Sequence, residues 1–244
     1  MLSTTSTHQR RAYARSMEGL AGDGEDEATV ILDSVYHAVL TLSRCTLHRM
    51  DVARAVLDAA IQIIATDGPD QVSMREVARR AGVSHQAPYH HFTDRAGIFA
   101  AISEEGFRTF TAEFRRTFDA SSDPLADCLR TYVGFALAHP GHFKVMFRSD
   151  ICGVTTHDAT RTAADEAFLA LLDLAATAGT PSSPADALAM PVALWAQAHG
   201  LATLLVDGPL AAKIPPELPI SDLIDAVARV ATHQFGSVPS PNQP

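Results

Sequence analysis

The sequence predicts an all-α fold, and three observations support this prediction. Alanine, the residue with the highest helix propensity, is abundant throughout the 244 residues. Apolar residues recur at three- and four-residue intervals, which is the spacing of one face of an amphipathic helix. No segment alternates apolar and polar residues as a half-buried strand would, and no internal repeat is visible. The composition, 47% apolar and 19% charged, is that of a globular protein with a sizeable core.

The chain divides by composition into four parts. Residues 1–49 are polar at first and then carry apolar residues at helical spacing, so we expect an extension that is disordered or partly helical. Residues 50–118 and 119–236 are expected to form two helical domains. Residues 237–244, rich in proline, are expected to be a tail.

Start and stop signals predict nine helices between these flanking segments. Asp123 and Ser183 are each followed by proline, the pattern of a capping residue before the first helical turn. Gly68 and Pro69 together stop the first helix. The expected helices cover about residues 51–66, 73–82, 84–92, 94–118, 123–138, 143–148, 157–178, 184–206 and 221–234.

The second and third expected helices form a helix-turn-helix. Ser73 is expected to cap the second helix in a capping box, with the Glu76 side chain bonding back to the Ser73 amide. Gly82 supplies the positive φ that the turn needs. Ser84 is expected to cap the third helix. Pro88 is then its fourth residue, where a proline removes only the first intrahelical bond.

The third helix is expected to present a polar face to solvent. Val83 and Ala87 are expected to point inward, which leaves hydrogen-bonding side chains outside, beside backbone amides that suit phosphate. The outward residues are Ser84, His85, Gln86, Tyr89 and His90. Such a face is compatible with contact to DNA.

The net charge of −9 does not exclude a nucleic-acid partner, because the acidic residues are concentrated in the C-terminal half. Residues 119–244 contain 13 acidic and six basic residues. Residues 71–95 contain four arginines, two acidic residues and three histidines. A locally positive element on an acidic body is compatible with DNA contact, because attraction to phosphate is short-ranged at physiological ionic strength.

The stretch VLDAAIQIIATDG…VSMREVARRAGVSHQAPYHHFTDRAGIFAAI, within about residues 52–105, closely resembles the DNA-binding domain of the tetracycline-repressor (TetR) family of bacterial regulators. The resemblance implies a homodimer that places one third helix in each of two successive major grooves of a palindromic operator. It implies base contacts from Ser84, His85, Gln86 and His90, and phosphate contacts from Ser73, Tyr89, His91 and Arg95. The chain departs from the family pattern at Arg95, more commonly lysine, and at Pro88, more commonly aliphatic.

The segment YVGFALAHPGHFKVMF and the W-x-x-x-H-G pattern ending at Gly200 resemble the WHG-type C-terminal domain of one branch of this family. The resemblance implies a ligand-binding and dimerisation domain, in a repressor that a small, mostly apolar effector releases from its operator. Candidate ligand contacts are Phe135, Phe143, Met146, Phe147, Trp195 and His199. Plain core packing is the alternative for each of them. We expect residues 184–206 and 221–234 to form the dimer interface.

No metal, cofactor or catalytic site is expected. His90 and His91 are adjacent, and His85 is five positions from His90, so none of these pairs has the i, i+4 spacing of helical metal ligands. The sequence has no G-x-S-x-G, no glycine-rich phosphate loop and no H-E-x-x-H. Two other classes of function stay open: a helical interaction scaffold that does not bind DNA, and a small-molecule enzyme.

The expected location is the bacterial cytoplasm, at the nucleoid. Cys45, Cys128 and Cys152 are widely spaced and form no C-x-x-C pair, which is typical of reduced thiols. No apolar run typical of a secretion signal follows the N-terminal arginines. Residues 187–206 lack charged residues and are long enough to span a bilayer. Their proline and high alanine content favour a helix buried on most sides by partner helices, so no membrane contact is expected.

Overall fold

The computed structural model describes residues 51–236, and all regular secondary structure in this range is helical. Nine α-helices lie within it, which confirms the all-α prediction. The expectations for residues 1–49 and 237–244 fall outside the described residues. The first described helix covers residues 51–67. The later elements are η1 (Pro69–Gln71), α3 (Met74–Ala81), α4 (Ala87–Phe92), α5 (Arg95–Ala120), α6 (Pro124–Ala138), α7 (Pro140–Met146), α8 (Asp158–Ala176), α9 (Pro184–Val206), η2 (Ala211–Lys213) and α10 (Ile220–Gly236).

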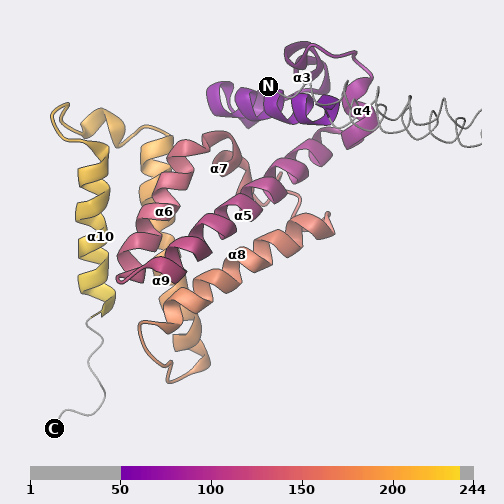
Figure 1. The fold of residues 1–244 in the computed structure, drawn as a ribbon. Helices are drawn as coiled ribbons and strands as arrows, with labels where there is room; N and C mark the ends of the chain where they lie inside the picture. Colours follow the sequence, from indigo (N-terminus) through magenta and orange to yellow (C-terminus); the bar gives the residue numbers. More distant parts are fainter. Residues whose placement is uncertain (1–50, 237–244) are drawn as a thin grey trace, which may run out of the picture. The chain divides into compact units, whose positions relative to one another are not determined.

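Helix 51–67 packs with α3 and the first turns of α5 around a small apolar core (Figure 1). Val56 and Ile63 from the first helix, Val77 from α3 and Ile98 from α5 are fully buried there. Burial of each such side chain contributes about 1.5–3 kcal/mol. This core is the support on which α3 and α4 are held.

The long helix α5 belongs to two cores at once (Figure 1). Asp94 begins it, because its carboxylate accepts a hydrogen bond from the Gly97 amide at 2.9 Å. Its first turns place Ile102 in the core shared with helix 51–67, and its later turns place Phe110 and Phe114 in a second core. The same rigid helix therefore connects the two apolar clusters.

The second core is formed by the later part of α5 together with α6, α8, α9 and α10. Both predicted caps with a following proline are confirmed. The Asp123 carboxylate accepts from the Ala126 amide at 3.4 Å and begins α6, and the Ser183 hydroxyl accepts from the Asp186 amide at 3.1 Å and begins α9. In Figure 1, α10 stands beside α6, which agrees with their extensive packing.

Helix α9 is less covered than the sequence predicts. Its length and mean hydropathy of 1.3 would suffice to cross a membrane, and a third (33%) of its apolar window is buried among the described residues. Leu194, Leu201 and Leu205 pack into the second core, but Leu188 and Val192 are 53% and 51% exposed. The expectation of burial on most sides is wrong, because α6 and α8 cover only one side of this uniformly apolar helix.

Candidate functional site

The turn between α3 and α4 has the predicted geometry. The Ser73 hydroxyl accepts from the Glu76 amide at 3.2 Å and caps α3. Gly82 ends α3 with φ 67° and ψ 27°, in the left-handed region that glycine adopts at little cost. Ala78 is fully buried. Both the cap at Ser73 and the positive φ at Gly82 confirm the sequence prediction.

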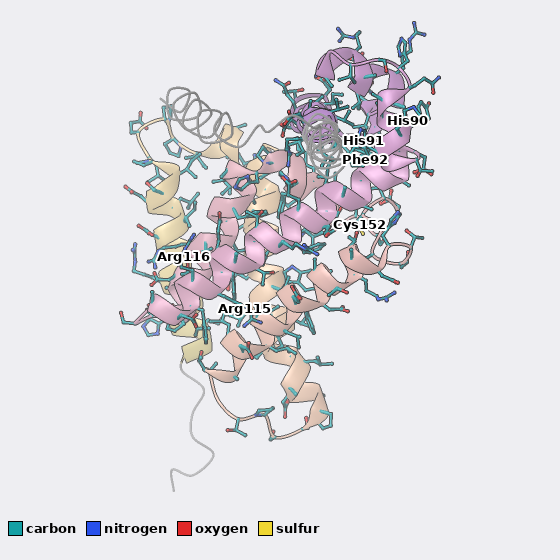
Figure 2. All side chains as sticks on the ribbon, turned by 45° about the vertical axis from the view of Figure 1, so that its right-hand side comes forward. His90, His91, Phe92, Arg115, Arg116 and Cys152 are labelled. Carbon is teal, nitrogen blue, oxygen red and sulfur yellow. The ribbon has the colours of Figure 1, made fainter. Side chains whose placement is uncertain are left out.

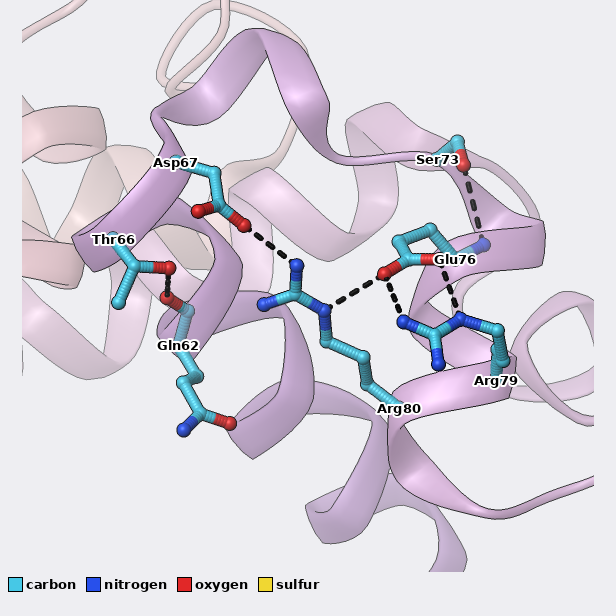
Figure 3. Close-up of polar contacts among 7 residues, drawn as sticks. All are labelled: Gln62, Thr66, Asp67, Ser73, Glu76, Arg79 and Arg80. Atoms are coloured by element: carbon cyan, nitrogen blue, oxygen red, sulfur yellow. Dashed lines mark hydrogen bonds and ion pairs between the residues drawn. The ribbon is translucent and has the colours of Figure 1, made fainter.

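The other bond of the predicted capping box, from the Ser73 amide to the Glu76 side chain, is wrong. Within the described residues the Glu76 carboxylate binds Arg79 at 2.6 and 2.8 Å and Arg80 at 2.8 Å, not the Ser73 amide (Figure 3). Hydrogen bonds from these two guanidinium groups lower the pKa of Glu76 to about 2. Arg80 also donates to Asp67 at 2.6 Å and so joins α3 to helix 51–67. Two cations one turn away outcompete a single backbone amide for a carboxylate.

This network changes the charge that α3 presents. Arg79 and Arg80 are paired with acidic side chains, so they contribute less positive potential than their number suggests. Arg75 is exposed and has no ion-pair partner among residues 51–236. Of the arginines on α3, Arg75 is therefore the cation available to a phosphate.

Helix α4 begins later than predicted. Gln86 is the residue that flanks the N-terminus of α4, and no side chain caps this helix. The expected cap at Ser84 is therefore wrong. The Ser84 carbonyl instead accepts from the Ala87 amide at 3.0 Å, in a turn that precedes the helix. Pro88 is buried and is the second residue of α4, not the fourth. Proline prefers this first turn, because its missing N–H has no intrahelical partner there.

The predicted exposed face of α4 is confirmed as exposed, while its contacts to DNA stay a prediction. Tyr89 is 51% exposed, and Figure 2 shows His90 on the outer side of α4. His91 is partly buried beside Phe92, with ring centroids 6.2 Å apart. The exposed set is Ser84, His85, Gln86, Tyr89 and His90.

Arg95 has a framework contact that the sequence did not indicate. Its guanidinium donates to the Pro69 carbonyl at 2.8 Å and lies 4.8 Å above the ring of Phe99. The hydrogen bond to Pro69 joins the start of α5 to η1. The side chain is 42% exposed, so one edge of the guanidinium remains accessible to solvent.

A largely apolar cavity of about 320 Å³ lies in the second core, between α5, α6, α8 and α9. We call it the aromatic cavity. None of its described lining residues is Asp, Glu, Lys, Arg or His. Cys128 and Cys152 line it as buried free thiols, and burial raises the pKa of Cys128 to about 12. The rings around it belong to Phe107, Phe110, Phe114, Tyr132, Phe147, Phe168 and Trp195.

The six residues predicted to contact a ligand do not all lie at the same site. Met146, Phe147 and Trp195 line the aromatic cavity. Phe135 is buried against Phe110, with centroids 5.4 Å apart, and does not reach the cavity. Phe143, Phe147 and His199 line a separate cleft, which also includes charged side chains; its other lining residues are Gly68, Pro69, Lys144, Arg148, Thr203 and Asp207.

Tyr132 was missed by the sequence prediction, although it begins the quoted segment YVGF. Its hydroxyl accepts from the Trp195 indole N–H at 3.2 Å and lies 2.9 Å from Nδ1 of His199. We assign the Tyr132 hydroxyl as donor to His199 Nδ1, which places the His199 proton on Nε2. Burial supports this neutral state, since it raises the pKa of Tyr132 and lowers that of His199.

Helix α7 contacts both the aromatic cavity and helix 51–67. Met146, at its end, lines the cavity. The Lys144 ammonium donates to the Ala65 carbonyl at 3.1 Å. Gly141 approaches helix 51–67 so closely that a Cβ there would lie 2.5 Å from the Ile61 carbonyl oxygen. A displacement of α7 at the cavity would therefore act directly on helix 51–67.

A polar network adds to this contact. Nε2 of His142 on α7 lies 3.2 Å from the Glu105 carboxylate on α5, which also binds Arg54 of helix 51–67 at 2.6 Å. His142 is 8% exposed, and its Nδ1 has no partner among the described residues. The ring of His139 lies 5.7 Å away. Burial outweighs the attraction of Glu105 and holds the pKa of His142 below its usual value.

Replacing His142 with glutamine is expected to reduce the loss of stability in mild acid. Below about pH 6.5 the unfolded chain protonates this histidine, but the folded protein does not. Stability therefore falls as the pH drops from about 6.5 through the lower folded-state pKa. Urea unfolding at about pH 7.5 and about pH 5 measures the loss, with exposed His85→Gln as the control. The prediction fails if the free energy of unfolding of His142→Gln falls between the two pH values by as much as that of the wild type.

Two domains known from other proteins match parts of the chain. Residues 56–102 match the family described as bacterial regulatory proteins, tetR family, and residues 125–229 match the tetracyclin repressor-like C-terminal domain. The HTH-type transcriptional regulator AcrR of Shigella flexneri is 32% identical over 74 residues, 29% of this chain and 34% of that protein. An uncharacterized HTH-type transcriptional regulator of Haemophilus influenzae is 30% identical over 115 residues, 46% of this chain and 55% of that protein. The chain thus spans about a third to about half of these curated relatives.

Solved structures share the fold over most of their length. A protein of unknown function from Rhodococcus sp. RHA1 is 28% identical, with a TM-score of 0.59 over 76% of this chain and 96% of that one. The TetR-like regulator LfrR of Mycobacterium smegmatis is 17% identical, with a TM-score of 0.54 over 79% of this chain and 99% of that one. Both halves of the chain match one family of regulators, and together these matches exceed half of its length. The chain therefore belongs to the TetR family of bacterial regulatory proteins.

Proposed function

We propose that this protein is a dimeric, DNA-binding transcriptional repressor that a small, mostly apolar effector releases from a palindromic operator. The observation that carries the proposal is the exposed surface formed by the turn before α4 and by α4 itself. Its exposed residues are all of hydrogen-bonding types, and the turn at Gly82 and the core below hold them in solvent. A helix presented in this way fits the major groove, where base edges are distinguished by their donors and acceptors.

The side chains of α4 suit two kinds of contact. Gln86, just before the helix, carries an amide that can bind adenine with two hydrogen bonds, and His85 and His90 are exposed as well. Ser73, Tyr89 and His91 are proposed to contact phosphates, which fix the position of the protein on DNA without selecting sequence. For Arg95 we propose one phosphate contact from its exposed edge, in addition to its bond to Pro69.

The direct test is selection of bound DNA from a random pool, followed by a mobility shift with the enriched sequence. The proposal expects a palindrome whose half-sites are about 34–36 Å apart. A helical scaffold without DNA binding, or an enzyme, would enrich no sequence. A DNA-binding regulator of this kind would work in the bacterial cytoplasm, at the nucleoid.

The dimer is proposed to form through α9 and α10. Four large apolar side chains on these helices are exposed. They are Leu188 (53%), Val192 (51%) and Leu204 (46%) on α9, and Val230 (61%) on α10. Leu188 and Val192 lie one turn apart on the same helix, and adjoining exposed apolar side chains of this kind are typical of an interaction surface. Two copies related by a twofold axis would cover this surface and place two α4 helices toward successive grooves.

Replacing Val230 with glutamate is expected to raise the dissociation constant of the dimer about 100-fold, or about 3 kcal/mol. The two symmetric carboxylates would be buried without partners. A dilution series in sedimentation velocity measures the effect. Leu169→Glu on α8, where the leucine is 53% exposed and lies outside the proposed interface, is the matched control and should leave the dimer intact. A wild-type protein that is monomeric at micromolar concentration would contradict the proposal.

The effector is proposed to bind in the aromatic cavity and to act through α7. A ligand that displaces Met146 or Phe147 moves the helix that carries Gly141 and Lys144, which contact helix 51–67. Release requires tighter binding to the state that does not bind DNA, with a coupling of about 1–3 kcal/mol. The structure of LfrR, which shares this fold, holds proflavine and is a precedent for a small ligand.

A further inference from the structure

The lining of the aromatic cavity restricts the charge of its ligand. Among the described residues that line it, the polar ones are Tyr132, Ser149, Thr155, Trp195 and two cysteines, all uncharged. Burial raises the pKa of Cys128 to about 12, so this thiol stays protonated at neutral pH and offers a cation no counter-charge. An ion held inside this cavity would therefore have no partner of opposite charge among the described residues that line it.

The aromatic rings do not remove this restriction. A desolvated cation over an aromatic face gains about 30-fold in affinity. Leaving an ion without counter-charge in an apolar site costs about 1000-fold or more. Several rings are also already engaged edge-to-face with one another, as Phe110 is with Tyr132 at 5.2 Å. The cost of the unpaired charge exceeds the gain from the aromatic rings, so the cavity favours a neutral ligand.

One donor at the cavity wall is placed to bind such a ligand. The Trp195 indole N–H reaches the Tyr132 hydroxyl at 3.2 Å, the long end of the hydrogen-bond range. Trp195 is 36% exposed and lines the cavity, so a carbonyl or ether oxygen can replace the Tyr132 oxygen as its acceptor. The Tyr132 hydroxyl keeps its bond to His199 at 2.9 Å meanwhile.

We propose that the aromatic cavity selects uncharged, mostly apolar molecules with one hydrogen-bond acceptor, which the Trp195 indole N–H binds, and that it excludes organic ions of the same shape. This inference rests on the proposed function only in taking the cavity to be the effector site. The volume of about 320 Å³ indicates a ligand of about two rings, because a dry cavity of about 150 Å³ holds benzene.

The first test compares four probes of similar shape in isothermal titration calorimetry with the full chain. They are 2-acetylnaphthalene, 2-isopropylnaphthalene, 2-naphthoate and 2-naphthylmethylammonium. The two neutral probes should bind at least about 100-fold more tightly than the two ions. Binding of either ion within about tenfold of 2-acetylnaphthalene overturns the proposal, and so does a failure of both neutral probes to bind up to their solubility limits.

The second test assigns the hydrogen bond. The affinity ratio of 2-acetylnaphthalene to 2-isopropylnaphthalene isolates the contribution of the carbonyl oxygen. Trp195→Phe keeps a ring but loses the N–H, so this ratio should fall about 2- to 12-fold. Tyr132→Phe leaves the indole N–H without its internal acceptor, so the ratio should stay equal or rise. A fall in Tyr132→Phe would show that the tyrosine hydroxyl binds the ligand instead, and this variant decides the question even where Trp195→Phe does not fold.

A mobility shift with the same probes separates this inference from the proposed function. If the probes bind in the expected order but leave operator affinity unchanged, the repressor switch fails and the ligand class stands. If an ion releases DNA as effectively as its neutral counterpart, the ligand class fails and the switch stands.

Discussion

Replacing both Gln86 and His90 with alanine is expected to reduce operator affinity to the level of random DNA. Each base contact contributes about 1–3 kcal/mol, and a dimer would lose four of them. The sum, about 4–12 kcal/mol, matches the usual gap of about 4–10 kcal/mol between specific and non-specific binding. Gln86, at the start of α4, and His90, on α4, are both exposed and contribute nothing to the core, so the fold should be unaffected.

The measurement is a mobility shift with the selected operator and with random DNA at one fixed salt concentration, since affinity for DNA depends strongly on salt. Gln62→Ala is the control, because this exposed glutamine lies on helix 51–67 of the same small core. It should leave both affinities unchanged. If the double variant lost affinity equally for operator and random DNA, Gln86 and His90 would contact phosphates and not bases.

Replacing Gly141 with alanine is expected to destabilise the protein where α7 meets helix 51–67. The new Cβ would lie 2.5 Å from the Ile61 carbonyl oxygen and 2.8 Å from its Cγ2. A backbone oxygen cannot rotate away, so one of the two helices must shift. Overpacking of this kind costs about 1–3 kcal/mol, although the helix propensity of alanine offsets up to about 1 kcal/mol of it.

Gly134→Ala provides a matched comparison. Gly134 lies on the exposed side of α6, and a Cβ there would meet no atom within 4 Å. Alanine should therefore stabilise α6 by about 0.5–1 kcal/mol. Urea unfolding should separate the two variants by about 1–3 kcal/mol, with Gly141→Ala the less stable. Equal stabilities would show that α7 does not pack tightly on helix 51–67.

The local features of the fold could be predicted because they depend on a few consecutive residues. The caps at Ser73, Asp123 and Ser183 bond to amides three positions away, and the positive φ at Gly82 is a property of glycine itself. The exposure of Tyr89 and His90 on α4 also followed from the sequence, because the helical period of about 3.6 residues determines which positions face the core.

Where a side chain had several possible partners, the sequence prediction was wrong or incomplete. Glu76 binds Arg79 and Arg80 and not the Ser73 amide, because two guanidinium groups are stronger donors than one N–H. Arg95 was expected to face a phosphate, and its bond to the Pro69 carbonyl depends on a residue 26 positions earlier in the chain.

The sequence by itself determined the helices, the turn that presents α4 and the family to which the chain belongs. Only the tertiary structure decided which aromatic residues surround a cavity, so that Phe147 and Trp195 line it while Phe135 is plain core. It also decided that α7 joins this cavity to helix 51–67, and that one side of α9 is left uncovered. Helices and caps arise from contacts within about four residues, whereas a cavity is the space left where helices from distant parts of the chain pack imperfectly.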